Sequence, residues 1–407
     1  MDCDFNAAKL LSFDEALANI VAQASPVLDT EKVSVFDIDG RVLAEGIKSS
    51  VNLPPYDNSA MDGYAVNLGF DQQAHSLPVI DTSLAGHPAQ KSLSAGESIR
   101  IMTGAKIPEG TTAVIMQENV TRTGDTIELN KLPKEHDNIR FTGEDIQIGS
   151  ELFSEGHLLT YRDVALLSAC GVSEVSVYKK VRIGLFSTGD ELVEPGSVLA
   201  SGQLYDSNRP MLFSMLNKLG VDVIDFGILE DNPDAIRAAL NDASETSDII
   251  ITSGGVSVGD ADYIKQILDE LGEINFWKVA MKPGKPVAFG YLGQCAFIGL
   301  PGNPVSSAVT FDQLATPFIK TMQHHPSPLP KRMKALAIND FKKRPGRMDF
   351  QRGISTQNEN GEWQVGSAGK QGSAILSAFS AANCHVLLSA ESEGANKGDI
   401  VTIVLYQ

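Results

Sequence analysis

Hydrophobic and polar positions change rhythm several times along this 407-residue chain. A helical period over residues 11–24 predicts an amphipathic helix, and Ser12 and Glu15 have the spacing of a capping box at its start. From about residue 49 to 140, short apolar runs alternate with Gly, Pro and Asp turns, which is typical of a small β-rich domain. An apolar helical period returns over Leu158–Ser168. The first half of the chain therefore predicts a β-rich domain flanked by helical stretches.

From about residue 179 the pattern becomes a regular alternation of strands and helices. The predicted strands are Arg182–Phe186, Val221–Phe226, Asp248–Thr252, Val287–Phe289 and Cys295–Leu300, and the helices begin near Asn208, Asn232, Asp262 and Pro304. Continuous apolar runs of this kind are typical of strands that are buried on both faces. Alternating strands and helices predict a mostly parallel sheet covered by helices. Right-handed crossovers then place the strand-to-helix loops on one edge of that sheet.

The last part of the chain returns to short alternating runs. The Pro-rich stretch His324–Pro330 is typical of a linker, and residues 331–407 show no convincing helical period, so we expect a small β-barrel or sandwich there. The predicted fold class is α/β and multi-domain: a central, mostly parallel sheet with helices on both faces, a small β-rich domain, and a C-terminal β-barrel-like domain. A chain of 407 residues with 43% apolar residues has room for about three domains.

Composition narrows the possible functions. Acidic residues outnumber basic ones by 51 to 33, a formal charge of −18, which argues against binding to nucleic acids or membrane surfaces. No apolar run approaches ~18 residues and the N-terminus is acidic, so we expect neither a membrane span nor a signal peptide. The four cysteines are Cys3, Cys170, Cys295 and Cys384. They lie far apart and form no CxxC pair, which predicts reduced thiols and a cytoplasmic location.

Three glycine-rich loops follow predicted strands: Ser187-Thr188-Gly189-Asp190-Glu191, Ser253-Gly254-Gly255-Val256-Ser257-Val258-Gly259-Asp260 and Leu300-Pro301-Gly302-Asn303-Pro304. In open α/β sheets, ligands bind in the crevice outside the carboxyl ends of the strands. Glycine lets backbone N–H groups approach an anion closely, and the following helix N-terminus adds positive charge. One such loop is equally well explained as a tight turn, but three at one edge predict a phosphate-type crevice. The second loop is no Walker A motif, because Asp260 stands where that motif has lysine.

Charged residues surround these loops. Lys278, Lys282 and Lys285 lie in a stretch stiffened by proline and glycine, where a bound polyanion would explain them as well as a solvated turn does. Carboxylates in loops suit Mg²⁺ beside a phosphate site, although each one alone is as readily a helix cap or a turn residue. The acids concerned are Asp62, Glu144, Asp145, Asp190, Glu191, Asp231, Asp260 and Asp262.

A set of short motifs runs in order along nearly the whole chain: Asp57–Ala65, Arg100–Gly104, Gly143–Asp145, Ser187–Leu192, Tyr205–Asn208, Ser253–Ser257, Lys282–Pro286, Pro301–Pro304, Gln371–Ser373 and Ala382–Cys384. Each motif is unspecific alone, but the ordered set is highly specific. It resembles the molybdopterin molybdenumtransferase family, the molybdenum insertases that include the gephyrin E domain.

The resemblance implies a division of the chain into four domains. Residues 1–48 with 141–178 would form an elongated α/β linking domain, and residues 49–140 the small β-rich domain. Residues 179–327 would bind the molybdopterin and its nucleotide, and residues 328–407 would form the C-terminal β domain. The family is a homodimer with a composite pocket, in which the α/β domain of one protomer faces the β-rich domain of the other.

The resemblance also implies the chemistry. The family is a transferase of molybdenum cofactor biosynthesis that inserts molybdenum from molybdate into adenylylated molybdopterin, releases AMP and uses Mg²⁺. The molybdopterin adenylyltransferase, which makes that substrate, is an expected partner. It is also the protein with which this chain could most easily be confused, but it would match residues 179–327 alone. Two classes without this activity stay open as well: a scaffold protein, and a binding module without turnover.

The motif positions and the loops together predict the site residues. Catalytic roles fall on Asp62, Asp145, Glu191, Asp231 and Asp262, of which Glu191, Asp231 and Asp262 are the predicted metal ligands. The predicted substrate-binding residues are Thr103, Ser187, Thr188, Gly189, Asp190, Ser253, Gly254, Gly255, Ser257, Lys278, Lys282, Pro301, Gly302, Asn303, Pro304 and Ser373.

Overall fold

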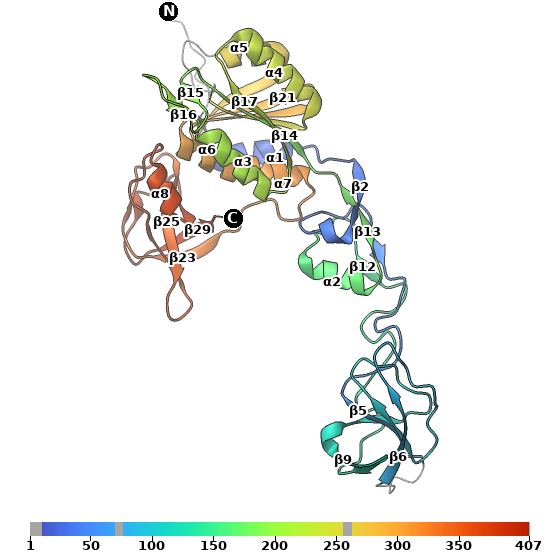
Figure 1. Ribbon diagram of the computed structural model, residues 1–407. Coiled ribbons are helices and arrows are strands. Elements are labelled where there is room, and N and C mark those ends of the chain that lie inside the picture. Colours follow the sequence, from blue (N-terminus) through green and yellow to red (C-terminus); the bar gives the residue numbers. More distant parts are fainter. Residues whose placement is uncertain (1–9, 70–75, 255–262, 407) are drawn as a thin grey trace, which may run out of the picture. The chain divides into compact units, whose positions relative to one another are not determined.

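The computed structural model describes residues 10–69, 76–254 and 263–406. The chain separates into two compact units (Figure 1). Unit 1 consists of Met1–Glu31 and Tyr178–Gln407, and unit 2 consists of Lys32–Val177. The finer division into four domains stays a prediction.

A seven-stranded sheet forms the centre of unit 1, in the order β1-β19-β21-β22-β18-β14-β17. These strands span Leu10–Leu11, Glu273–Val279, Pro286–Leu292, Cys295–Leu300, Ile249–Ser253, Arg182–Thr188 and Asp222–Leu229 in that order. Strands β22, β18, β14 and β17 are parallel neighbours, whereas β21 runs antiparallel to both β19 and β22. The prediction of a mostly parallel sheet is therefore confirmed. Strands β1 and β19 were missed, because a two-residue strand has no period and β19 carries polar residues.

Helices cover both faces of this sheet, as predicted (Figure 1). One face packs against α1 (Phe13–Ala22), α3 (Asn208–Lys218), α6 (Pro304–Thr310) and α7 (Thr316–Met322), and the other against α4 (Pro233–Thr246) and α5 (Tyr263–Leu271). Successive side chains of a strand point to opposite faces. In β18, Ile249 and Ile251 accordingly join the first core, and Ile250 joins the second.

Local signals set the helix ends. The Ser12 hydroxyl accepts a hydrogen bond from the Glu15 N–H at 3.2 Å, and the Glu15 carboxylate accepts one from the Ser12 N–H at 3.0 Å, which completes the predicted capping box. Asn232 caps α4 as predicted, through the N–H groups of Asp234 and Ala235. The long helix predicted after Pro304 is interrupted by a π-helix, η3 (Phe311–Ala315), between α6 and α7.

A barrel follows in the C-terminal part of unit 1. Its strands run in the order β20-β25-β26-β23-β29-β27, and an added pairing of β25 with β27 closes the ring. They span Met281–Lys282, Met348–Gln357, Trp363–Ser367, Met333–Ala337, Ile400–Leu405 and Cys384–Leu388. The β-barrel prediction is confirmed, but the expectation of no helix was wrong, because α8 (Leu376–Ala381) is too short to show a period.

The stretch predicted as a linker is anchored at its start. The His324 ring stacks on Tyr178 with 3.7 Å between the ring centroids. Its Nε2 lies 2.8 Å from the carbonyl oxygen of Val27. The linker therefore begins with packed side chains.

Unit 2 contains a six-stranded sheet and a separate small core. The sheet has the order β8-β5-β7-β6-β10-β9, with strands Ala113–Met116, Gly63–Asn67, Glu97–Ile101, Ser76–Ser83, Thr126–Leu129 and Val120–Thr123. It confirms the predicted β-rich domain. The second core gathers α2 (Tyr161–Ala169) with short strand pairs β2–β13 (Thr30–Ser34, Glu174–Tyr178) and β3–β12 (Ile47–Lys48, Glu151–Phe153). Within the described ranges of the chain, no helix is long and apolar enough to cross a membrane.

Removing side-chain volume from β18 tests how far the fold depends on the sheet core. Ile251 is fully buried there, so Ile251→Ala is expected to lower the free energy of unfolding by about 2–5 kcal/mol. The matched control is Ile400→Ala, since Ile400 is 63% exposed, and it is expected to cost less than about 0.5 kcal/mol. Urea denaturation followed by tryptophan fluorescence measures both, and equal losses would contradict this account of the core.

Candidate active site

Three parallel strands deliver the three glycine-rich loops to one edge of the unit 1 sheet. Across the ladder, Ser187 at the end of β14 lies beside Ser253 of β18, which lies beside Leu300 of β22. The N–H of Gly254 donates to the carbonyl of Leu300 at 3.2 Å. The predicted convergence of these loops is therefore confirmed for their described residues.

Glycine is required where the loops touch. Gly254 has a φ of +98°, and a Cβ on it would lie 2.8 Å from the carbonyl oxygen of Thr188, which is closer than real side chains come. A Cβ on Gly302 would lie 3.9 Å from the Cα of Gly254. The first and second loops therefore pass one another backbone to backbone, and the backbone of the third loop lies beside that of the second.

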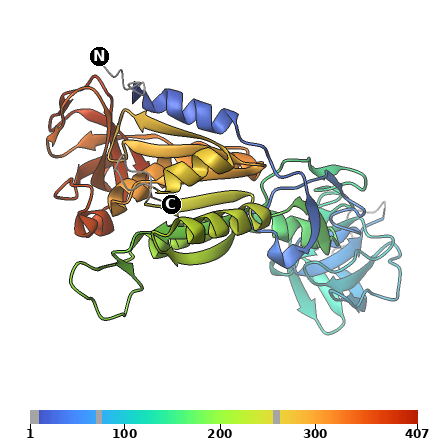
Figure 2. The same cartoon turned by 90° about the horizontal axis from the view of Figure 1, so that it is seen from above.

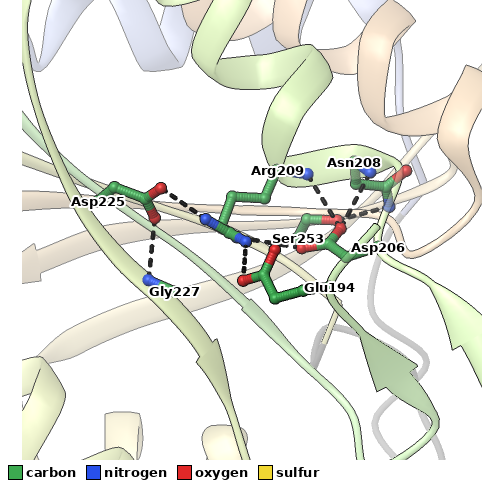
Figure 3. A network of polar contacts seen from close by, with 7 residues as sticks. All are labelled: Glu194, Asp206, Asn208, Arg209, Asp225, Gly227 and Ser253. Carbon is green, nitrogen blue, oxygen red and sulfur yellow. Dashed lines mark hydrogen bonds and ion pairs between the residues drawn. The ribbon is translucent and has the colours of Figure 1, made fainter. Parts of the chain in front are cut away.

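Asn208, which the prediction of site residues missed, ties two of the loops to helix α3 (Figure 3). Its Nδ2 donates to the Ser253 Oγ at 2.6 Å and to the carbonyl oxygen of Gly302 at 2.7 Å. In the sequence Asn208 was interpreted as a helix start, and its presence in the Tyr205–Asn208 motif was the signal that could have identified it.

Two buried polar atoms of the crevice have no hydrogen-bond partner among the described residues. They are the Oδ1 of Asn208 and the Oγ of Ser187, whose residues are 8% and 0% exposed. Buried polar atoms are normally paired, and an unpaired one costs stability. A ligand with hydrogen-bonding groups is therefore the kind of molecule that this edge is built to accept.

The predicted carboxylates Asp190, Glu191 and Asp231 gather at the same edge. The N–H of Asp231 donates to Asp190 Oδ1 at 2.9 Å. Burial, followed by repulsion from Asp190 and Glu191, raises the pKa of the Asp231 carboxyl above its ordinary value. A Cβ on Gly189 would lie 2.6 Å from Oε2 of Glu191, so the Glu191 carboxylate folds back over the first loop. This concentration of negative charge would be relieved by a cation.

The predicted lysines Lys278 and Lys282 lie on strands that do not carry the three loops. Lys278 lies in β19, which β21 separates from the loop-bearing strand β22. Lys282 lies in β20, and its Nζ pairs at 3.3 Å with a buried carboxylate of the barrel, Asp349. In this structure the Lys282 ammonium therefore has a protein counter-ion.

The C-terminal barrel reaches the third loop. The N–H of Val305, at the start of α6, donates to the carbonyl oxygen of Ser373 at 3.1 Å, which places this predicted residue beside the crevice. Arg352 of β25 donates to the neighbouring Gly372 carbonyl at 3.1 Å, and its buried Nε lacks a partner in the described part of the chain. Arg352 was missed because a lone arginine in a strand pattern carries no local signal.

Of the predicted residues of unit 2, Asp62 and Thr103 contact each other. Asp62 Oδ1 accepts hydrogen bonds from the N–H and the hydroxyl of Thr103 at 2.7 and 2.9 Å. The backbone bond from Thr103, followed by its hydroxyl bond, lowers the pKa of Asp62. Asp57 holds Thr142 in the same way, at 2.7 Å for both bonds. The exposed Asp145 lies three residues after Thr142.

Close backbone packing explains the residue after Asp62. A Cβ on Gly63 would lie 1.9 Å from the carbonyl oxygen of Ile115, so β5 and β8 can meet only with glycine there. Two neighbouring residues therefore make different contacts: Asp62 accepts the hydrogen bonds of Thr103, and Gly63 allows the close approach of β5 and β8.

Some predicted residues lie outside the described part of the chain: Gly255, Ser257, Asp260 and Asp262. Among the described residues, no group of three or more His, Cys, Asp or Glu side chains has the geometry of a metal site. A cavity of about 260 Å³ in unit 1 is lined by none of the predicted site residues, and its walls include Met211, Met215, Phe311 and Phe379. The loops, rather than this cavity, carry the chemistry suited to anions.

Comparison with known proteins agrees with the geometry. Residues 11–171 match the MoeA N-terminal region (domain I and II), residues 184–321 a probable molybdopterin binding domain, and residues 334–406 the MoeA C-terminal region (domain IV). The fold and the crevice thus define an enzyme class that handles molybdopterin.

Full-length relatives identify the family. The chain is 46% identical over 396 residues to a molybdopterin molybdenumtransferase of Haemophilus influenzae, covering 97% of this chain and 98% of that protein. It is 33% identical to one from Staphylococcus aureus over 97% of this chain and 95% of that protein. A Pyrococcus horikoshii molybdopterin biosynthesis moeA structure superposes with a TM-score of 0.83 at 32% identity, covering 98% of this chain and 100% of that one. The chain belongs to the molybdopterin molybdenumtransferase family. It is a transferase of molybdenum cofactor biosynthesis.

The raised pKa of Asp231 predicts how stability depends on pH. Above the ordinary value of 3.8, the folded state holds this proton more tightly than the unfolded state, so the shift costs stability as pH rises. Asp231→Asn removes that cost, and its stabilisation relative to the natural chain is expected to grow with pH upward from about 3.8. Thermal melts from about pH 4 to about pH 8, which cover the upper part of carboxyl titration and the range beyond it, measure this gain.

Asp242→Asn is the control for that experiment, since it removes the same charge from an exposed position on the helix that follows, α4. It is expected to give no gain that grows with pH. A stability difference for Asp231→Asn that stays flat across the pH range would contradict the proposed repulsion among the three acids.

Proposed function

We propose that this enzyme inserts molybdenum into adenylylated molybdopterin, taking molybdate as the metal source and releasing AMP. The observation that carries the proposal is the crevice itself, where three glycine-rich loops meet and buried polar atoms of Ser187 and Asn208 lack partners among the described residues. Glycine-rich loops at the carboxyl ends of parallel strands suit a phosphate-bearing ligand. A pterin joined to a nucleotide through a phosphoanhydride has both phosphates and polar rings to offer.

The residues of the crevice bind and orient this substrate. In the proposed reaction, water attacks one phosphorus of the anhydride, the bridging P–O bond breaks, and AMP leaves. Two thiol sulfurs of the pterin then bond to molybdenum, and one molybdate oxygen leaves as water with the two thiol protons. Backbone N–H groups of the three loops would stabilise the charge on phosphate, and most of the rate would come from such positioning.

We assign Asp190, Glu191 and Asp231 to a divalent cation such as Mg²⁺, which prefers oxygen donors and would have to draw these side chains together, since as they stand they lack the geometry of a metal site. Burial and then repulsion from Asp190 and Glu191 raise the pKa of Asp231, and a cation would offset that repulsion. Asp262 is proposed as a further ligand. Bound there, Mg²⁺ would neutralise phosphate charge and make phosphorus more electrophilic.

The acids of unit 2 are assigned to the molybdate side. The lowered pKa of Asp62 keeps it a carboxylate, which would repel molybdate directly. We therefore assign Asp62 to holding the loop of Thr103, whose N–H and hydroxyl donate to it, and Asp145 to the rim of the site. In a homodimer, Asp62, Thr103 and Asp145 of one protomer would complete the crevice of the other. We further propose a cytoplasmic location and handover of substrate from the adenylyltransferase.

AMP release tests the reaction. Incubation with adenylylated molybdopterin, Mg²⁺ and molybdate is expected to release AMP only when molybdate is present, with molybdenum recovered on the pterin. Ser187→Ala is the matched variant, since it removes an unpartnered crevice hydroxyl, and it is expected to weaken substrate binding by about tenfold. AMP release that does not need molybdate would identify a plain hydrolase and refute the proposal.

Mixed dimers test the composite pocket. Asp62→Ala and Asp231→Asn alter different units, so a heterodimer of the two variants would contain one intact site and one with both changes. When the variants are co-expressed with different tags and purified through both, activity is expected to return to about half of that of the natural dimer. If each site is built within one chain, the heterodimer stays as inactive as the two variants alone.

A further inference from the structure

Arg209 occupies an unfavourable place for a cation. It is the second residue of α3, where the helix dipole already adds positive charge, and it is only 8% exposed. Burial by itself would lower the pKa of the guanidinium, but Asp225, Glu194 and Asp206 together raise it above its ordinary value. The position therefore depends on its three carboxylate partners.

The three partners come from three different elements (Figure 3). Asp206 precedes α3 and accepts from Arg209 Nε at 3.2 Å, Asp225 of β17 accepts from Nη1 at 2.5 Å, and Glu194 accepts from Nη2. Glu194 belongs to the 192–205 loop, the segment whose two ends, β15 (Leu192–Val193) and β16 (Leu204–Tyr205), pair in parallel. One guanidinium thus joins the helix, the sheet and this loop.

Two of these partners, Asp206 and Asp225, are themselves held by backbone N–H groups. Asp206 is 1% exposed and also accepts from the N–H groups of Asn208 and Arg209 at 3.1 Å each, so it caps the helix. Asp225 accepts from the N–H of Gly227 at 2.9 Å, at the irregularity in β17. Arg209 is therefore fixed on one side.

The 192–205 loop is held differently at its two ends. Its β16 end runs through Asp206 directly into α3, whereas Glu194, at the β15 end, has a side chain that is 56% exposed. Leu204 and Asp206 donate their N–H groups to the carbonyls of Glu191 and Val193, and these bonds join β15 to β16. Val198 is 94% exposed, and the loop extends away from the helices as a green loop in Figure 2. The Glu194–Arg209 ion pair is thus a side-chain link from the β15 end of the loop to α3.

This connection reaches the reaction site through the chain itself. The 192–205 loop continues directly from the first glycine-rich loop, and the carbonyl of Glu191 accepts the N–H of Leu204. The neighbour of Arg209, Asn208, holds the second and third loops through Ser253 and Gly302. The start of α3 is therefore linked to all three loops.

We infer that Arg209 is a positioning residue, and that its pair with Glu194 latches β15 against β16 and α3, so that Glu191 is held where the substrate phosphates and their cation bind. The inference rests on the proposed function for the identity of that substrate. Without the latch the β15 end of the 192–205 loop samples open positions, and substrate binding has to close it again. The apparent affinity falls by the fraction of protein that is closed.

Glu194→Gln tests the latch, because it removes one charge of the pair and leaves Asp206 and Asp225 in place. Hydrogen exchange at the Leu204 and Asp206 amides is expected to quicken by about fivefold, and KM for adenylylated molybdopterin is expected to rise by about fivefold with kcat within about twofold. Arg209→Lys is expected to act in the same direction, since an ammonium cannot reproduce the planar fork. The double variant is expected to resemble Arg209→Lys alone, because Arg209→Lys has already lost the contact that Glu194→Gln removes.

Arg182→Lys is the matched control. Arg182 pairs with Asp248 at 2.7 Å at the start of β14, the end of the strand opposite to the loops. Its substitution is expected to leave both KM and the hydrogen exchange of the Leu204 and Asp206 amides unchanged.

Two results would overturn the inference. Unchanged hydrogen exchange of the Leu204 and Asp206 amides in Glu194→Gln would show that the ion pair does not hold β15 against β16, whatever the activity. Lower kcat with unchanged KM, in proportion to a loss of folded protein, would reduce Arg209 to a structural residue. Failure of the proposed function is seen separately, as the absence of molybdate-dependent AMP release in the natural chain, and the exchange measurement still decides on the latch.

Discussion

The start of helix α3 is the point on which the crevice depends. Asn208 bonds to the second and third loops, and its neighbour Arg209 pairs with Glu194 in the segment that continues the first. Parallel strands bring the loops to the same edge, but strand pairing alone leaves their tips free. Side chains from one helical turn supply the missing constraint, and a cation buried there requires three carboxylates to offset its desolvation.

The same edge keeps like charges close together. Asp190, Glu191 and Asp231 are all exposed there, and burial followed by repulsion from the other two acids raises the pKa of Asp231. Unpartnered polar atoms of Ser187 and Asn208 among the described residues cost stability. Stability lost at a binding edge can be recovered when a ligand supplies the missing charge and hydrogen bonds. This is the physical reason to place the chemistry at the loops and not in the apolar cavity beside Met211.

Unit 2 shows a second way to hold acids. Asp62 and Asp57 each accept both the N–H and the hydroxyl of a threonine, Thr103 and Thr142, which are distant in sequence. These carboxylates serve as clamps between loops, so their hydrogen bonds are satisfied within the protein. Asp62 and Asp57 thus differ from Asp231 of unit 1, whose pKa is raised by burial and by its acidic neighbours.

Sequence alone determined the features that arise from local chemistry. The apolar runs of β14, β18 and β22, the capping box at Ser12 and the cap at Asn232 follow from neighbouring residues, and so does the placement of the glycine loops after strands. The ordered motifs indicated the family. Tertiary structure alone decided what depends on distant contacts: that α6 and α7 are separated by a π-helix, that Lys282 pairs with Asp349, and that Asn208 and Arg209 join the loops. A side chain's partner across a fold leaves no trace in its neighbours along the chain, because burial and distance are set only when separate elements pack.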